Sequence, residues 1–236
     1  LAGYQVENSS AKLRFADNIL TIKEYKGVML GGTISASGTI NLSAGNYQLH
    51  IKGSGIDSGI LAEHIPDFSG PVNADIVASG DGRDLAQATV YGTASVPEGS
   101  YRGIPFHKLE TSFYYAGGRL TLDYLNAGLE QGMITAGGTV DSARIEVNMS
   151  ANHVPLGLIA GQFDIPLEGT ADFAGTLTGT PSFPVLAVNF KAADGQAFYQ
   201  PFTEAGGTVT VNPGQVILDG ITLSDGTASH KLAGTM

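Results

Sequence analysis

The sequence has no cysteine and no tryptophan, and charged side chains make up only 14% of its 236 residues. The lack of cysteine excludes a disulfide scaffold, a cysteine-ligated zinc site and a thiol nucleophile. A net charge of −10 argues against a nucleic-acid partner, because phosphate binding requires clustered basic side chains. The longest stretch without Asp, Glu, Lys or Arg, residues 27–51, is rich in Gly, Ser and Thr. It therefore predicts β-structure and not a membrane-spanning helix.

Alternation of apolar and polar residues dominates what the sequence does contain. A period of two places one face of a strand against an apolar space and the other against water. Turn-forming pairs such as Asp81-Gly82 and Asp225-Gly226 separate the runs, as in antiparallel hairpins. With 42% hydrophobic residues and few charges, the chain is expected to collapse and not to remain disordered. We therefore predict an all-β, mostly antiparallel fold.

The chain also matches itself at a shift of about 96–100 residues, which is the mark of a repeat-built protein. Leu20-Thr21-Ile22 recurs as Leu120-Thr121-Leu122, and Gly38-Thr39-Ile40 recurs as Gly138-Thr139-Val140. Several such matches in the same order predict an elongated architecture, in which each unit contacts mainly its neighbours.

The self-match divides the chain into three parts. Residues 1–37 form a partial repeat, residues 38–137 a first unit, and residues 138–236 a second unit whose C-terminal part is truncated. Since the sequence opens at Leu1 within a repeat, we expect it to be a fragment of a longer protein. The three parts are expected to form one continuous β-groove, with unprotected first and last strands that favour end-to-end self-association.

One segment in each unit departs from the period of two. Residues Ile56–Phe68 place apolar side chains near helical spacing, and Val154–Phe163 do the same one repeat later. Pro155 suits the first turn of a helix, and Pro66 and Pro166 close the two segments. We expect one short helix per repeat.

These segments carry a resemblance to a known family. Residues 58–80 pair the short apolar helix with a glycine, an alternating strand and another glycine, and residues 156–179, Pro181 and 187–190 repeat this arrangement. Along essentially its whole length, the chain resembles the TamB/AsmA-like bacterial envelope proteins. The resemblance implies a sheet curled into a U-shaped trough, a β-taco, with an apolar inner face and a periplasmic location.

The family resemblance also implies a function and partners. The trough would shield phospholipid acyl chains for transport between the inner and outer membranes. The inner-membrane anchor and the outer-membrane partner would belong to missing parts of the parent protein. Family members are also tied to the assembly of outer-membrane proteins, so a scaffold that adds client strands to its edges is an alternative. A β-helical adhesin or polysaccharide-acting protein is a second alternative.

The apolar strand positions have two interpretations from sequence alone. They could fill an ordinary closed sandwich or β-helix core, or they could line an open trough whose missing partner is lipid. An aliphatic lining makes no hydrogen-bond demands, and it would suit acyl chains of unspecified length. The candidate lipid-binding residues are Leu49, Ile51, Leu120, Leu122, Ile145, Val147, Leu186, Val188, Val209, Val211, Val216 and Leu218.

No constellation of residues predicts catalysis, a metal site or a cofactor. The histidines His50, His64, His107, His153 and His230 lack the spacing of metal ligands, and we expect His50 and His230 on solvated strand faces. The acidic pairs Asp81 with Asp84 and Asp219 with Asp225 do not fit a calcium loop and are interpreted as turn carboxylates. We therefore do not expect an enzyme.

Overall fold

The computed structural model describes residues 5–61, 65–82, 87–161 and 166–235. Strands make up 78% of the structure and helices 5%. They form one antiparallel sheet that does not close into a barrel, in which the order of the strands follows the order of the chain. The predicted all-β, antiparallel fold is therefore confirmed.

The elements lie in chain order as follows. The first nine strands and a 3-10 turn are β1 (Val6–Ala16), β2 (Ile19–Met29), β3 (Gly32–Asn41), β4 (Asn46–Asp57), η1 (Ser58–Leu61), β5 (Phe68–Ser69), β6 (Pro71–Asp81), β7 (Thr89–Tyr101), β8 (Ile104–Ala116) and β9 (Arg119–Gly128). They are followed by β10 (Met133–Val140), β11 (Ile145–Pro155), α1 (Leu156–Ala160), β12 (Leu167–Thr180), β13 (Phe183–Ala197), β14 (Gln200–Asn212), β15 (Gln215–Ser224) and β16 (Ser229–Thr235).

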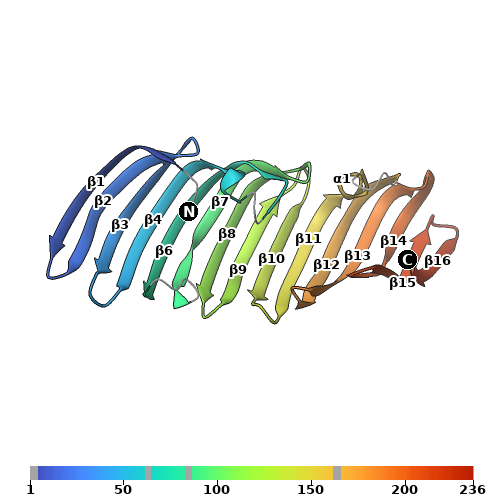
Figure 1. Ribbon diagram of the computed structural model, residues 1–236. Helices are drawn as coiled ribbons and strands as arrows, with labels where there is room; N and C mark the ends of the chain where they lie inside the picture. Colours follow the sequence, from blue (N-terminus) through green and yellow to red (C-terminus); the bar gives the residue numbers. More distant parts are fainter. Residues whose placement is uncertain (1–4, 62–64, 83–86, 162–165, 236) are drawn as a thin grey trace. The chain divides into compact units, whose positions relative to one another are not determined.

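The chain divides into two compact units, residues 1–124 and residues 125–236. From here on, unit 1 and unit 2 mean these two compact units and not the sequence repeats. Within each unit, strands that follow one another lie side by side, and short turns join pairs such as β1–β2 and β13–β14 (Figure 1). The strand β5 is the exception, because it pairs with the end of β7 beside β6.

Strand register assigns the residues of unit 1 to two faces of the sheet. Ala36, Ile51 and Ile76 lie directly opposite one another on β3, β4 and β6, so their side chains share one face. Lys52, which follows Ile51, and Asp75, which precedes Ile76, are partners on the other face. We call these the apolar face and the polar face.

Unit 2 shows the same division into two faces. Phe173 of β12 lies opposite Phe190 of β13 on the apolar face, and their neighbours Asp172 and Lys191 lie opposite each other on the polar face. Between the β-bulges, side chains alternate along each strand, so each register match extends this division to the neighbouring strand.

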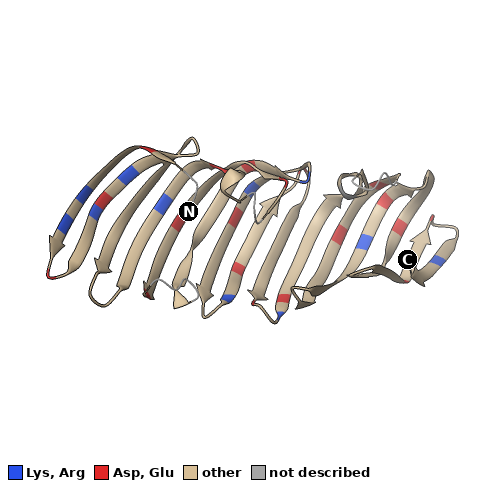
Figure 2. Cartoon of the chain, in the orientation of Figure 1, with Lys and Arg blue, Asp and Glu red and all other residues tan. Residues whose placement is uncertain are grey.

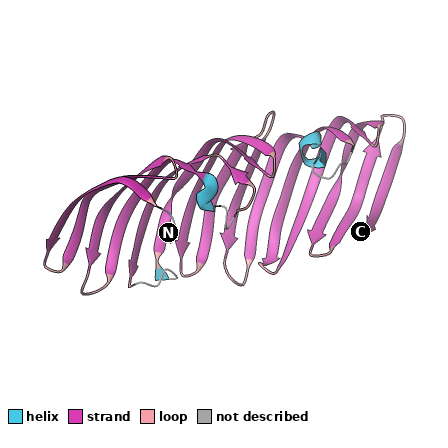
Figure 3. Ribbon diagram, turned by 45° about the horizontal axis from the view of Figure 1, so that its top comes forward, coloured by secondary structure: helices cyan, strands magenta, loops and turns pink. Residues whose placement is uncertain are grey.

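The buried cluster of unit 2 lies where α1 covers one end of the apolar face. Leu156 of α1 packs with Ala171, Ala192 and Phe202, which come from three successive strands. Figure 3 shows η1 and α1, each over the strand ends of its own unit. These helical turns cover only one end of the apolar face, so most of its length has no second layer in the described part of either unit.

The helical segment of unit 1 is shorter than the sequence predicted. A helix was expected over Ile56–Phe68, but among the described residues of this range only Ser58–Leu61 are helical. Ile56 continues β4 and is buried opposite Val72 of β6, and Phe68 belongs to β5. Burial against the neighbouring strand outweighs the local helical spacing at Ile56.

The helical segment of unit 2 differs in the same way. The expected helix over Val154–Phe163 is α1, Leu156–Ala160. Val154 remains in β11, where it is 2% exposed and lies opposite Ala171. Phe163 lies outside the described residues. One helix in every repeat stays a prediction.

Equivalent glycines of the two units have the same local geometry. Gly38 and Gly138 both have positive φ, 146° and 152°. A Cβ atom at Gly38 would fall on the carbonyl oxygen of Gln48, and one at Gly138 would fall on that of Glu146. The sequence match between these positions therefore corresponds to one shared backbone requirement, a close approach of neighbouring strands that only glycine allows.

Candidate apolar binding face

Eight of the predicted lipid-binding residues lie in unit 2, and register brings them together on the apolar face. Leu186 lies opposite Val211, which lies opposite Val216. In the neighbouring row, Val188 lies opposite Val209, which lies opposite Leu218. Six of the eight residues thus form two adjacent rows across β13, β14 and β15.

The rows continue into the strands that precede β13. Leu186 lies opposite Leu177 of β12, and Leu177 lies opposite Val147 of β11. Val147 and Ile145 are alternate residues of β11 and therefore share this face. All eight candidates of unit 2 are on the apolar face, and one row of aliphatic side chains crosses five strands.

The four candidates of unit 1 also lie on the apolar face. Leu49 and Ile51 are alternate residues of β4, opposite Ala78 and Ile76 of β6. Leu120 and Leu122 alternate in β9 with Asp123, whose carboxylate accepts a hydrogen bond from the polar-face hydroxyl of Ser112. The leucines therefore point to the opposite side from Asp123.

The exposure of these residues distinguishes an open face from a closed core. Among the twelve, only Ile145 is buried, at 8% exposure, whereas Leu120 and Val211 are exposed by 39% and 38%. The other nine are half-buried. A closed sandwich core would bury most of them, and a β-helix would pair its strands in parallel. The single antiparallel sheet matches neither of these two alternatives.

Several residues of the same face are not among the twelve predicted from the sequence. Leu177 completes the long aliphatic row of unit 2, and the pair Phe173 and Phe190 adds a third row. In unit 1, Ile34 and Ile76 lie among the chosen residues. The signal was present, because each lies at an alternating position, but only strand register shows which alternating runs share a face.

The polar face of unit 1 holds a network of ion pairs. The Lys12 and Lys26 ammonium groups lie 2.7 Å and 2.5 Å from the two oxygens of Glu24. Their hydrogen bonds hold the pKa of Glu24 at about 2, below its ordinary 4.5, and the bond to Glu24 raises the pKa of Lys12. Figure 2 shows basic and acidic segments side by side on β1 and β2.

A second ion-pair group lies farther along the same face. Lys52 lies 2.8 Å from Asp75, and His50 also bonds the Asp75 carboxylate. Hydrogen bonds from Lys52 and then His50 lower the pKa of Asp75. His50 is thus on a half-exposed polar face, as the sequence indicated.

The other candidate polar residues are scattered. His107 and His153 are exposed, and the His153 ring lies 3.8 Å from Asp172. His230 is exposed but lies opposite Leu223, so it is on the side of the apolar face. His64 lies outside the described residues. Within the described ranges, no group of three or more His, Cys, Asp or Glu side chains could hold a metal ion.

The predicted turn carboxylates are placed in part. The Asp225 carboxylate accepts hydrogen bonds from the backbone of Ala228 and Thr227 and from the Thr227 hydroxyl. These bonds lower the pKa of Asp225 to about 2. The carboxylate therefore stabilises its own turn, as predicted. Asp219 lies within β15, opposite Thr208, and not in a turn. Asp84 lies outside the described residues.

Comparisons with known proteins give no identification. No family model, no curated protein and no solved structure matches the chain. Among the residues that the structure describes, no helix has the length and apolar character needed to span a membrane.

Proposed function

We propose that the apolar face of this sheet binds and shields phospholipid acyl chains. The observation that carries the proposal is the aliphatic row from Val147 through Leu177, Leu186 and Val211 to Val216, most of which is only half-buried. No second layer covers this row within the described residues of unit 2. An exposed apolar row favours an apolar partner, and an acyl chain requires no hydrogen-bonding groups from it.

The energetics favour an extended aliphatic ligand. Each methylene that leaves water contributes roughly 0.8 kcal/mol. Neighbouring strands are about 4.8 Å apart, so a row across five strands extends for about 19 Å, and several methylenes can be covered at once. The surrounding side chains offer no hydrogen-bonding groups in the row, so the site selects for apolar length and not for a particular headgroup.

The resemblance noted in the sequence supports a cellular setting for this activity. We propose that the chain is a segment of a periplasmic groove for transport of phospholipid between the inner and outer membranes. The anchor and the outer-membrane partner would be supplied by other parts of the parent protein.

A pair of substitutions in unit 2 tests the proposal. Val188→Glu places a charge in the aliphatic rows, whereas Asn189→Glu places the same charge one residue away on the polar face. We expect Val188→Glu to reduce the phospholipid carried by the protein at least tenfold in native mass spectrometry. The reason is that an acyl chain bound over Val188 would have to remove the unpaired glutamate charge from water, which is costly. Asn189→Glu should carry as much lipid as the parent.

A second pair in unit 1 repeats the test independently. Leu122→Arg should reduce photo-crosslinking to a phospholipid with a photoreactive acyl chain, and Thr121→Arg should not. Circular dichroism must show parental strand content in all four variants. Equal lipid loading by folded Val188→Glu, Leu122→Arg and the parent would show that these residues have only a structural role.

A further inference from the structure

A cavity of about 930 Å³ lies on unit 1 and crosses strands β1 to β9. On most of these strands the cavity is lined by three consecutive residues, for example Lys52, Gly53 and Ser54 on β4. The first and third of these are polar-face residues, and the middle one belongs to the apolar face. The apolar-face residues two positions away, such as Ile51, do not contribute. The cavity therefore opens on the polar face, with backbone as its floor.

Two rows of polar side chains form the walls of this cavity. Register aligns the first row from Lys26 through Ser35, Lys52 and Asp75 to Thr93. The second row runs from Thr33 through Ser54, Asn73 and Ser95 to Glu110.

The rows cross the strands at right angles to the chain direction. At about 4.8 Å per strand, the seven strands from β2 to β9 along the main sheet path give a channel about 30 Å long.

The charges in the channel are balanced. Lys26 is paired with Glu24, and Lys52 is paired with Asp75. An anionic ligand would have to displace these carboxylates, so the channel does not favour a phosphate or a nucleic acid. Its hydroxyl, amide, ammonium and carboxylate groups supply both donors and acceptors, as a ligand rich in hydroxyl groups requires.

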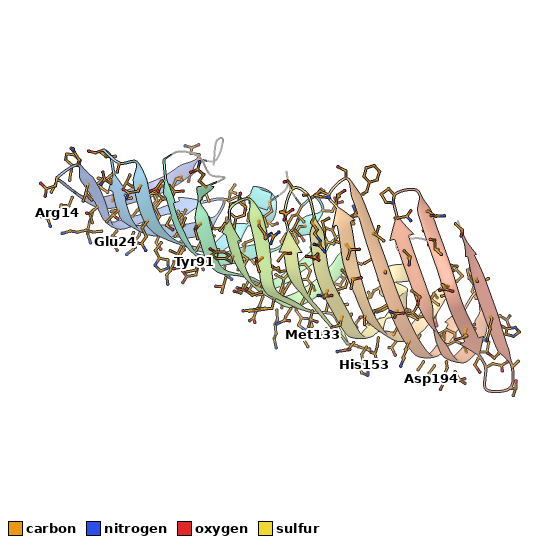
Figure 4. All side chains as sticks on the ribbon, turned by 90° about the horizontal axis from the view of Figure 1, so that it is seen from below. Arg14, Glu24, Tyr91, Met133, His153 and Asp194 are labelled. Atoms are coloured by element: carbon orange, nitrogen blue, oxygen red, sulfur yellow. The ribbon has the colours of Figure 1, made fainter. Side chains whose placement is uncertain are left out.

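An exposed aromatic pair lies beside the channel on the same face. Tyr91 of β7 and Tyr114 of β8 are direct cross-strand partners, exposed by 48% and 45%. Tyr91 is two residues from Thr93 of the channel wall and therefore shares its face. Figure 4 shows Tyr91 on the same side of the ribbon as Arg14 and Glu24.

We propose that this channel binds an extended, neutral polysaccharide chain. A sugar ring combines hydroxyl groups at its edge with an apolar C–H face, and the channel supplies polar walls beside two solvent-exposed aromatic rings. Within unit 1 the channel is on the polar face, whereas the acyl-chain candidates Leu49 and Ile51 are on the apolar face, so the two proposals can be tested separately.

Oligosaccharide titration tests the proposal. Because the protein has no tryptophan, its intrinsic fluorescence comes from its nine tyrosines, which include Tyr91 and Tyr114. We expect cellohexaose or chitohexaose to change the tyrosine emission of the parent protein in a saturable way. The double variant Tyr91→Ala/Tyr114→Ala should bind at least tenfold more weakly by calorimetry, and Tyr91→Phe/Tyr114→Phe should retain most of the affinity, since it keeps both rings.

Two controls separate this site from other causes. Tyr199→Ala removes a tyrosine that is 77% exposed in a turn of unit 2, and it should leave sugar affinity unchanged. Val188→Glu, which is designed to block lipid, should also leave it unchanged. The proposal is overturned if the parent binds neither neutral hexasaccharide, if it binds only anionic polymers, or if the folded double alanine variant binds as tightly as the parent.

Discussion

Each unit contains a glycine that lies opposite a phenylalanine on the neighbouring strand, and we call this pair the glycine–phenylalanine corner. A different segment packs over the phenylalanine in each unit. In unit 1, a Cβ at Gly99 would fall on the Ser69 carbonyl oxygen and close to the Phe106 ring. In unit 2, a Cβ at Gly195 would meet the Glu168 carbonyl oxygen and the Phe202 ring. Each phenylalanine lies opposite its glycine on the neighbouring strand. The bare glycine therefore provides the space that the ring fills.

What lies over the ring differs between the two units. Phe68 of β5 stacks on Phe106, with ring centroids 5.5 Å apart. Over Phe202, the aliphatic Leu156 of α1 takes part in the buried cluster, with Leu167 packed against it. The glycine–phenylalanine pair is thus shared by the two units, whereas the segment that covers the ring differs and is apolar in both. We therefore expect the covering segment to tolerate apolar substitutions of similar volume.

The largest effect is expected from removing the shared ring. Phe106 and Phe202 are 8% and 4% exposed, so Phe106→Ala and Phe202→Ala should each lower the free energy of unfolding by about 4 kcal/mol. Phe68→Leu should cost only about 1 kcal/mol, because it loses an aromatic contact but keeps an apolar cover. Urea denaturation followed by circular dichroism measures all three. A loss for Phe68→Leu as large as that for Phe106→Ala would contradict the comparison.

A smaller and equal effect is expected from filling the glycine space. Gly99→Ala and Gly195→Ala should each destabilise the protein by about 2 kcal/mol, because the new methyl group must displace a carbonyl oxygen or the ring. Gly103→Ala is a matched control in a turn, where a Cβ meets no atom within 4 Å but φ is +78°. Its cost should be about 1 kcal/mol and purely conformational. If hydrogen exchange shows that only one corner responds to its alanine substitution, the corners are not equivalent.

The smallest expected effect on the free energy of unfolding comes from two carboxylates, Glu24 and Asp225. Both have low pKa values, but the causes differ. Glu24 in unit 1 is held at about 2 by Lys12 and Lys26, and Asp225 in unit 2 is held at about 2 by its own turn. In both cases the folded pKa lies below the unfolded value. The stabilising contribution is therefore present above about pH 4.5 for Glu24 and is lost as the pH falls through about 2.

Salt distinguishes the two origins. In a carbon-detected NMR titration, 1 M NaCl should raise the midpoint of Glu24 clearly, because it screens exposed ion pairs. The midpoint of Asp225 should move less, since backbone and hydroxyl hydrogen bonds within the turn are little screened. Lys12→Ala should likewise raise the Glu24 midpoint and leave Asp225 unchanged. Equal salt shifts at the two sites would show that the causes are not different.

The sequence predicted strand faces well because their signal is local. Leu186, Val188 and Phe190 alternate with polar neighbours, and one residue of register error would turn every one of them to the other side. It predicted helices poorly at Ile56 and Val154, because both are buried against a neighbouring strand that is distant in sequence. The polar channel was not predicted at all, since Lys52 and Asp75 are 23 positions apart and only register pairs them.

The sequence by itself determined the all-β class, the antiparallel turns and the alternation that makes one side of each strand apolar. These follow from side-chain period and turn chemistry, which act within a few residues. Only the tertiary structure decided that the rows of different strands align. It also decided that the described residues place no second layer over most of the apolar face, and that the polar face of unit 1 carries a channel. These properties depend on hydrogen-bond register between strands and on exposure to solvent, which are set by contacts between residues far apart in the chain.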